Sequence, residues 1–427
     1  MADITPLRRH RDFRRLWLGQ LVSFVGTQLT VVGVAVEAFR ITHSTLMVGL
    51  ISLGQLVPLL VASLVGGAVS DAMDRRKLLL ITQVAAAAAS AGLLLNALVP
   101  HPKLWPLFVC TAVAAAVSGV DWPARKAALP MLVPVEDLAP ALAVSQIQTQ
   151  VGFIAGPALA GVLIAAFGFP VVFAIDAASF VAVFAAVLLL PPLVPKGGGT
   201  PAGLKSVREG LSYLRHQRLL ASTFLIDINA MVFGMPRAVF PALGLGLYGG
   251  GPGTVGLLYA APAAGALIGA VMSGWVGGVR HQGRAVVFAV AAWGAAIAAF
   301  GFIPVLWIGL ALLAVAGAAD VVSAVFRNTI LQTTVPEHLQ GRLSGMFIAV
   351  VTGGPRLGDA EAGGAAAIGG PQFAVWSGGL ACVVGAAAIA WRVPELWRYD
   401  VRPPPPASPG PIDFEAGAIT ELSESGG

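Results

Sequence analysis

The chain has 427 residues, of which 57% are hydrophobic and only 11% charged, and its mean hydropathy is +0.82. Soluble domains are roughly 25% charged, so this composition excludes water as the main solvent of the folded chain. The formal net charge of +5 is not gathered on a soluble domain, which argues against nucleic-acid binding. The two cysteines and six scattered histidines indicate no disulfide framework, no metal site and no catalytic cluster, and no cofactor is expected.

Apolar blocks of about 20 residues, the length that a helix needs to cross a hydrocarbon core, recur along the chain. We expect twelve such helices, at about 16–39, 46–70, 78–99, 104–120, 138–167, 170–190, 219–247, 253–278, 285–303, 304–326, 340–367 and 371–392. They form two six-helix halves, 16–190 and 219–395. A basic cap, 1–15, precedes the first half, and a Pro- and Gly-rich linker, 191–218, with an amphipathic surface helix at 206–218 joins the halves. The Pro-rich, then acidic segment 396–427 is expected to be a disordered tail.

The basic residues indicate the orientation of these helices. Most Lys and Arg fall in the amino-terminal cap, the central linker, the carboxyl-terminal tail and loops on the same side, whereas Arg40 and Lys103 fall on the opposite side. By the positive-inside rule, both termini and the linker are cytoplasmic. We therefore expect a multi-pass protein of the cytoplasmic membrane, and a monomer.

A segment of the first half recurs 202 residues later in the second half. The matched pairs are Arg125 and Arg327, Leu129 and Leu331, Pro134 and Pro336, Gly152 and Gly354, Gly156 and Gly358, and Gly161 and Gly363. A fixed internal period in a strongly apolar chain is typical of transporters built from two similar halves. The function is therefore expected between the halves. No phosphate-binding loop is present, so ATP is not expected to power the protein, and it is not expected to be an enzyme.

The loop between the second and third expected helices resembles the Gly-x-x-x-Asp…Arg-Arg/Lys motif of the major facilitator superfamily. The resemblance covers about residues 11 to 395. It implies an all-α membrane protein with twelve transmembrane helices in two pseudo-symmetric halves. It also implies a conformational latch on this loop. The latch residues expected from the motif and the repeat are Gly67, Asp71, Arg75, Arg76, Lys77, Arg125 and Arg327.

Glycines of the fifth expected helix resemble the helix-packing motif of drug/proton antiporters. The residues are Gly152, Gly156, Pro157 and Gly161, with Gly354, Gly358 and Gly363 as their counterparts in the second half. Small residues let neighbouring helices approach closely, so both helices are expected to slide against a partner. Further motifs, such as Phe240-Pro-Ala-Leu243 and Gly341-Arg342, resemble the branch that includes the enterobactin exporter. That resemblance implies siderophore efflux.

Ionisable residues inside the expected helices need a partner or a purpose, because each costs at least about 2.5–3.5 kcal/mol in a membrane. The candidates for proton coupling or substrate contact are Glu37, Asp227, Arg237, Asp320, Arg356, Asp359 and Glu361. The resemblance places Asp227 and Asp320 at the central cavity, where desolvation would favour the protonated form. Alternatively these are packing contacts: Asp320 would pair with Arg327, and Arg356 with Asp359 three residues on. Asp176 is expected to be structural.

These observations predict a secondary active exporter of a small amphiphilic molecule, most simply a siderophore, that works by proton-coupled alternating access in the lipid bilayer. The alternative within transport is a multidrug efflux pump. A non-transporting membrane sensor of the same fold is the alternative from another class.

Overall fold

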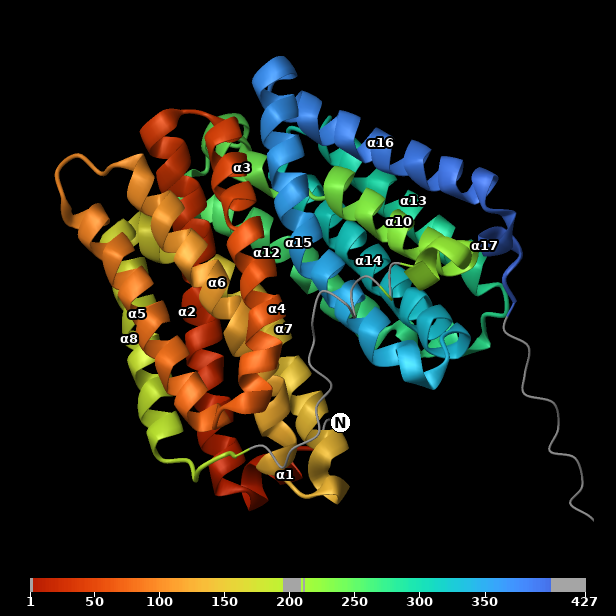
Figure 1. Ribbon diagram of the computed structural model, residues 1–427. Helices are drawn as coiled ribbons and strands as arrows, with labels where there is room; N and C mark the ends of the chain where they lie inside the picture. The colour runs from red at the N-terminus through yellow and green to blue at the C-terminus, as the bar shows by residue number, and fades with distance from the viewer. Residues whose placement is uncertain (1–2, 195–208, 210–211, 401–427) are drawn as a thin grey trace, which may run out of the picture.

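A computed structural model describes residues 3–194, 209 and 212–400. Within that part of the chain all regular structure is helical, and the helices form two bundles that stand side by side (Figure 1). Of the expected amphipathic helix 206–218, the structure describes residues 209 and 212–218, and 209 and 212–216 are helical. Most of the expected tail 396–427 lies outside the described residues. The described end of the chain includes a short helix, α17 (Pro394–Arg398), whose Leu396 is fully buried, so the ordered part of the second half extends past residue 395.

The first bundle, here the N half, holds the elements up to residue 188. They are α1 (Thr5–Arg9), α2 (Arg11–Thr42), α3 (Thr45–Gly54), α4 (Leu56–Ala72), α5 (Arg75–Leu98), α6 (Leu104–Ala128), η1 (Leu129–Met131), α7 (Val135–Phe167) and α8 (Phe169–Leu188). The second bundle, the C half, holds the remainder. Its elements are α10 (Arg218–Phe233), η2 (Arg237–Val239), α11 (Phe240–Ala242), η3 (Leu243–Leu247), α12 (Gly251–Val271), η4 (Ser273–Gly278), α13 (Gln282–Phe300), α14 (Leu306–Thr334), α15 (Glu337–Gly369), α16 (Pro371–Arg392) and α17.

Eleven helical segments among the described residues are long and apolar enough to cross a membrane. Three of them combine shorter elements: α3 with α4, α6 with η1, and α10 with the three short elements that follow it. The remaining long helix, α15, has 33 residues and carries Arg356, Asp359 and Glu361. It packs against α3, α10 and α16, within the bundle, so it completes the expected set of twelve long segments.

The internal repeat predicted from the sequence is confirmed by the element boundaries. Helices α7 and α15 both have 33 residues, and each begins directly after a proline, Pro134 or Pro336. Both end at a glycine with a positive φ, 82° at Gly168 and 87° at Gly370, a backbone conformation that favours glycine. All of these equivalent positions are 202 residues apart.

Several expected helices have different limits in the structure. The helix expected at 46–70 is divided at Gln55 into α3 and α4, and the one expected at 253–278 ends at Val271 and is followed by η4. Helix α6 continues through Pro123 to Ala128, and α14 continues to Thr334, because the polar residues of these extensions stay in helical register beyond the apolar run. The helix expected at 219–247 is interrupted after Phe233. Pro236 cannot donate a backbone hydrogen bond, and the chain resumes as η2, which begins at Arg237.

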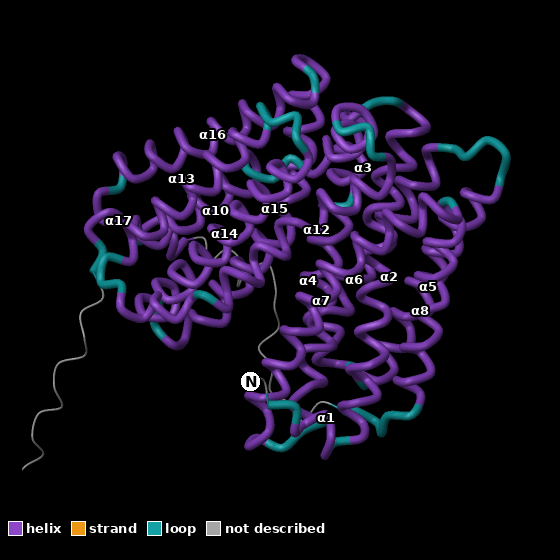
Figure 2. The backbone as a smooth tube through the Cα atoms, turned by 180° about the vertical axis from the view of Figure 1, so that it is seen from behind, coloured by secondary structure: helices purple, strands orange, loops and turns teal. Residues whose placement is uncertain are grey.

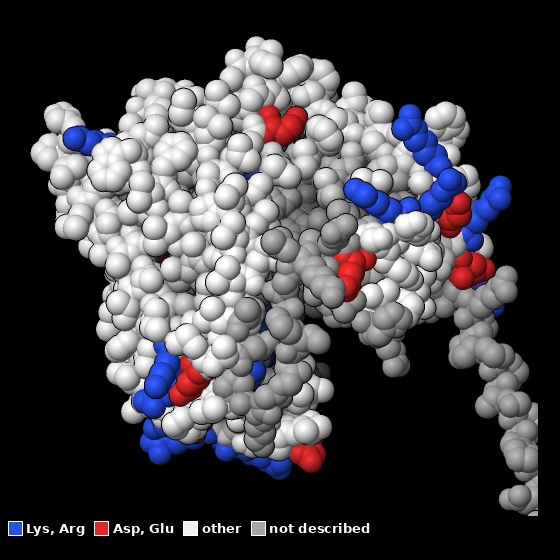
Figure 3. All heavy atoms as spheres, viewed as in Figure 1, with Lys and Arg blue, Asp and Glu red and all other residues white. Residues whose placement is uncertain are grey.

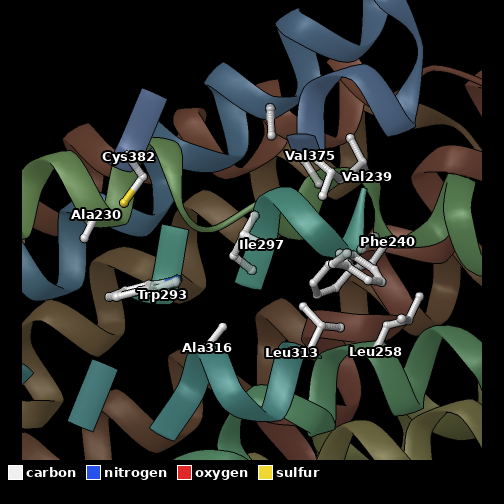
Figure 4. Packing of buried hydrophobic residues seen from close by; sticks show 14 of the residues in the cluster. Ala230, Val239, Phe240, Leu258, Trp293, Ile297, Leu313, Ala316, Val375 and Cys382 are labelled. Atoms are coloured by element: carbon white, nitrogen blue, oxygen red, sulfur yellow. The ribbon is translucent and has the colours of Figure 1, made fainter. Parts of the chain in front are cut away.

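Buried apolar side chains fill the interior of the C half. Figure 4 shows Phe240, Leu258 and Leu313 lying together, with Ile297 and Val375 close by. These residues come from five different elements, so the cluster holds the C half together as one body.

The two halves contact each other mainly through two helix pairs, α7 with α12 and α3 with α15. A β-carbon at Gly161 in α7 would lie 2.7 Å from the carbonyl oxygen of Pro252, and a β-carbon at Gly363 in α15 would lie 2.7 Å from that of Thr45. Only glycine permits such close backbone approach. Gly161 and Gly363 therefore pack closely across the contact between the halves, whereas Gly152, Gly156, Gly354 and Gly358 approach helices of their own half.

The halves meet at one end of the molecule and part at the other. We call the end at which α2 leads into α3 the contact end, and the end that carries α1 the open end; Figures 1 and 2 show the bundles diverging from the first toward the second. Figure 3 shows that Lys and Arg gather at the open end of the N half and near α17 in the C half, and are sparse at the contact end.

Candidate functional site

Three charged residues of the C half form a buried cluster. Arg327 of α14 lies 2.8 Å from Asp227 of α10 and 3.8 Å from Asp320, which is two turns earlier in α14. The side chains of Arg327 and Asp227 are almost completely buried, whereas 30% of the Asp320 side chain remains exposed. The pairing of Asp320 with Arg327 considered from the sequence is thus present. One cation faces two carboxylates, so the cluster carries one negative charge unless one carboxylate is protonated.

The equivalent place in the N half holds a neutral arrangement. Arg125 of α6 pairs with Asp121 one turn earlier, as their spacing predicts. Asp121 also accepts hydrogen bonds from Thr82, at 2.7 Å, and Gln83, at 2.9 Å, both of α5. Arg125 and Arg327 are equivalent in the repeat, but Ser323 stands where Asp121 would recur. At these equivalent positions, therefore, only the C half has a carboxylate in excess.

A second cluster crosses the contact between the halves. Asp359 of α15 accepts a hydrogen bond from the Ser52 hydroxyl of α3 at 2.6 Å, and lies 3.1 Å from the guanidinium of Arg237. The Tyr259 hydroxyl donates to the backbone carbonyl of Arg237 at 3.0 Å. The intrahelical pairing of Arg356 with Asp359 is wrong: the interruption after Phe233 brings Arg237 to Asp359 instead.

Arg356 and Glu361, the other charged residues of α15, form no ion pair with any described residue. The Nη1 of Arg356 donates to the carbonyl of Thr352 in the preceding turn, and its Nε has no hydrogen-bond acceptor in the described chain. Glu361 points away from the N half: its carboxylate lies 3.9 Å from where a β-carbon on Gly378 of α16 would be.

Two carboxylates of the N half have contrasting surroundings. Asp176 of α8 accepts hydrogen bonds from Thr30 of α2 at 2.7 Å and Ser90 of α5 at 2.6 Å, as the structural interpretation requires. Glu37 of α2 is 1% exposed, and neither of its carboxylate oxygens has a hydrogen-bond partner in the described structure. The hydrogen bonds of Asp176 join α2, α5 and α8, which all belong to the N half. Asp176 therefore stabilises the packing of that half.

The loop that carries the expected latch is bound to its own half. Arg75 donates to the carbonyl of Ala127 at 3.3 Å and Arg76 to that of Leu188 at 2.7 Å. Asp74 caps α5 by accepting from the amide of Arg76 at 3.0 Å, and it also accepts from the amide of Leu193 at 2.9 Å. Gly67 lies within α4 and Lys77 is exposed in α5. The side chain of Asp71 lies outside the described part, so the latch remains a prediction.

Ser52 and Tyr259 were not identified from the sequence. Ser52 stands seven residues after Thr45 and three after Gly49, so the three share one helical face, and this small polar face in an apolar run was the available signal. Tyr259 carries no comparable signal. No group of His, Cys, Asp and Glu side chains among the described residues could hold a metal ion.

Solved structures show what fold these halves make. The nucleoside transporter NupG superimposes with a TM-score of 0.71 at 12% identity, over 91% of this chain and all of that chain. A bacterial homologue of the human lysosomal transporter Spinster, described as inward-facing and unoccupied, gives a TM-score of 0.68 at 14% identity, over 92% and 97% of the two chains. The architecture is that of major facilitator transporters.

Sequence comparison identifies the family within that class. The model of the transmembrane secretion effector family matches residues 1–416, so the chain belongs to this family of the major facilitator superfamily. An enterobactin exporter, EntS, of Citrobacter koseri is 30% identical over 410 residues, which are 96% of this chain and 98% of the relative. EntS of Shigella boydii is 29% identical over 404 residues, 95% and 97% of the two chains.

Proposed function

We propose that this protein exports a siderophore from the cytoplasm by proton-coupled alternating access. The observation that carries the proposal is the likeness to enterobactin exporters along nearly the whole chain, in a fold whose halves meet at only one end. A cargo molecule enters between the halves at the open end. Rocking of the halves then closes that end and opens the contact end.

The charged ends support an orientation with the open end toward the cytoplasm. Lys and Arg gather at the open end of the N half and near α17, which is the pattern of cytoplasmic loops (Figure 3). Both termini are then cytoplasmic, in the inner membrane. A single chain contains both halves and the space between them, so a monomer suffices for this mechanism.

The excess carboxylate of the C half is the best-supported site for the coupling proton. Arg327 neutralises one of its two carboxylates, and burying the other as a charged group would cost several kcal/mol. The cluster is therefore neutral when one of its two carboxylates carries a proton. Because Asp320 keeps part of its side chain exposed, it is the member that can exchange this proton with water, while Asp227 holds Arg327 in place.

Transport into sealed inside-out vesicles tests this proposal. Purified protein in vesicles with an acidic lumen should accumulate enterobactin, because protons leaving the lumen drive cargo in. Asp320→Asn removes the exchangeable proton, so accumulation should fall at least tenfold, while exchange of labelled for unlabelled enterobactin without a proton gradient persists. Glu395→Gln, at an exposed carboxylate of α17, is the matched control and should transport normally.

Absence of enterobactin movement in the unmodified protein would contradict the proposed cargo. Accumulation by Asp320→Asn at the normal rate would contradict this proton site. Equal transport of unrelated lipophilic cations would favour the multidrug alternative instead.

A further inference from the structure

One face of α15 passes from the contact between the halves into the space where they part. Thr352, Arg356, Asp359 and Gly363 follow at intervals of four, three and four residues, so they share this face. Its upper part touches α3: Ser52 donates to Asp359 at 2.6 Å, and Thr45 donates to the carbonyl of Gly363 at 3.4 Å. The face therefore points toward the N half.

Exposure along this face rises from the contact end toward the open end. Asp359 is 7% exposed, Arg356 is half-buried, Thr352 is exposed, and Ile348, one turn further, is 40% exposed. A β-carbon on Gly345 would meet no atom within 4 Å. Arg356 therefore lies at the inner limit of the opening, one turn below the Ser52–Asp359 contact.

The guanidinium of Arg356 has donors that no described residue uses. It has five N–H groups, and its one hydrogen bond goes from Nη1 to the carbonyl of Thr352. Asp359 is already held by Arg237 and Ser52. Glu361 lies on the other side of α15, toward α16, and the five-residue spacing within one helix keeps it apart from Arg356. The carboxylate of Asp359 also acts on Arg356 electrostatically, so two guanidinium groups share one carboxylate. A cation at membrane depth costs at least about 2.5 kcal/mol, and an anion from outside the described side chains would balance the second guanidinium.

We propose that Arg356 binds the cargo through a pair of anionic oxygens. The planar guanidinium fits a carboxylate or a catecholate in a two-pronged arrangement, which a point charge such as lysine does not reproduce. This inference rests on the proposed function and adds the chemical class of the cargo, which is a molecule with a pair of anionic oxygens. The cargo would be held beside the Ser52–Asp359 contact, on the side of the open end.

Binding of two related probes to the purified full-length protein in detergent tests the inference by calorimetry. Enterobactin offers catechol oxygens that can ionise, whereas its fully O-methylated form offers none. The unmodified protein should bind enterobactin at least tenfold more tightly than the methylated form. Arg356→Gln should lose that preference, binding both equally, and Arg356→Lys should retain only part of it. Arg392→Gln, at the exposed end of α16, is the matched control and should keep the full preference.

The outcomes separate this inference from the function on which it rests. If the unmodified protein binds neither probe, the proposed cargo fails. If it binds both equally, or if Arg356→Gln keeps the preference, a siderophore exporter remains but the anion site at Arg356 is overturned. Thermal unfolding of each variant identifies any that does not fold. If Arg356→Gln does not fold, the two probes still test the anion site on the unmodified protein, because equal binding of both would overturn it.

Discussion

The two contacts between the halves have the same backbone packing but different chemistry. At α7 with α12 and at α3 with α15, equivalent glycines let the helices meet at the same distance. The first contact adds one neutral hydrogen bond, from Gln150 to the carbonyl of Ala263 at 3.1 Å. The second adds a carboxylate, Asp359, held by Ser52 across the contact and by Arg237 within the C half. The repeat thus supplies two similar surfaces, of which only one can respond to charge.

This difference also separates the halves themselves. Arg125 faces one carboxylate, so that pair is neutral, whereas its equivalent Arg327 faces two carboxylates. In the N half, Glu37 and Asp176 also lie buried without an ion pair to any described residue, but each stands alone, whereas the charged groups of the C half form clusters. We propose that proton exchange and cargo binding take place in the C half and that the N half provides the surface against which it moves.

The largest effect is expected from filling the glycine contacts. Gly49→Ala would press a β-carbon against the backbone carbonyl of Asp359, and Gly256→Ala would do the same at Pro157. Neither backbone can move without moving a whole half, and overpacking of this kind costs about 1–3 kcal/mol or more. At the upper end of that range, we expect export rates to fall about a hundredfold in both variants.

Gly364→Ala is the control, because a β-carbon there meets nothing within 4 Å. Vesicle transport measures all three. Normal export by either of the two contact variants would show that the contact end does not need to close this tightly.

Ser52→Ala is expected to have a smaller effect, which is limited to how often the contact end opens. The lost hydrogen bond ends on a charged group, and such bonds contribute about 1.5–3 kcal/mol. The contact end should therefore open about tenfold more often. Labelling of a cysteine at Leu46 by a membrane-impermeant maleimide from the outside measures this, in a background without Cys110 and Cys382.

Ser63→Ala, at an exposed serine of α4, should leave labelling unchanged. Equal labelling in Ser52→Ala and the unmodified protein would mean that the Ser52–Asp359 bond does not hold the contact end shut.

The smallest effect is expected from Gln150→Ala at the other contact. A neutral hydrogen bond contributes about 0.5–1.5 kcal/mol, so labelling at Leu46 should rise only about threefold. An increase as large as that of Ser52→Ala would remove the distinction between the two contacts.

The sequence predicted the repeat, the helical architecture and the residues that bring the halves together, because apolar length and glycine spacing are local signals. The pair Asp320 with Arg327, one of the alternatives considered from the sequence, lies within a single helix. The sequence did not predict Arg237 with Asp359, since these are 122 residues apart and meet only because the chain breaks after Phe233. Pairs of that kind depend on tertiary packing, which spacing does not encode.

Alternating access of the two ends is the central claim, and distances between spin labels test it most directly. One pair, His101 with Ile368, reports on the contact end, and a second, Val135 with Gln332, reports on the open end; all four residues are exposed. When enterobactin and a proton gradient are applied to the protein in vesicles, the first distance should lengthen in a fraction of molecules while the second shortens in the same fraction. Two distances that stay fixed, or that lengthen together, would contradict the account.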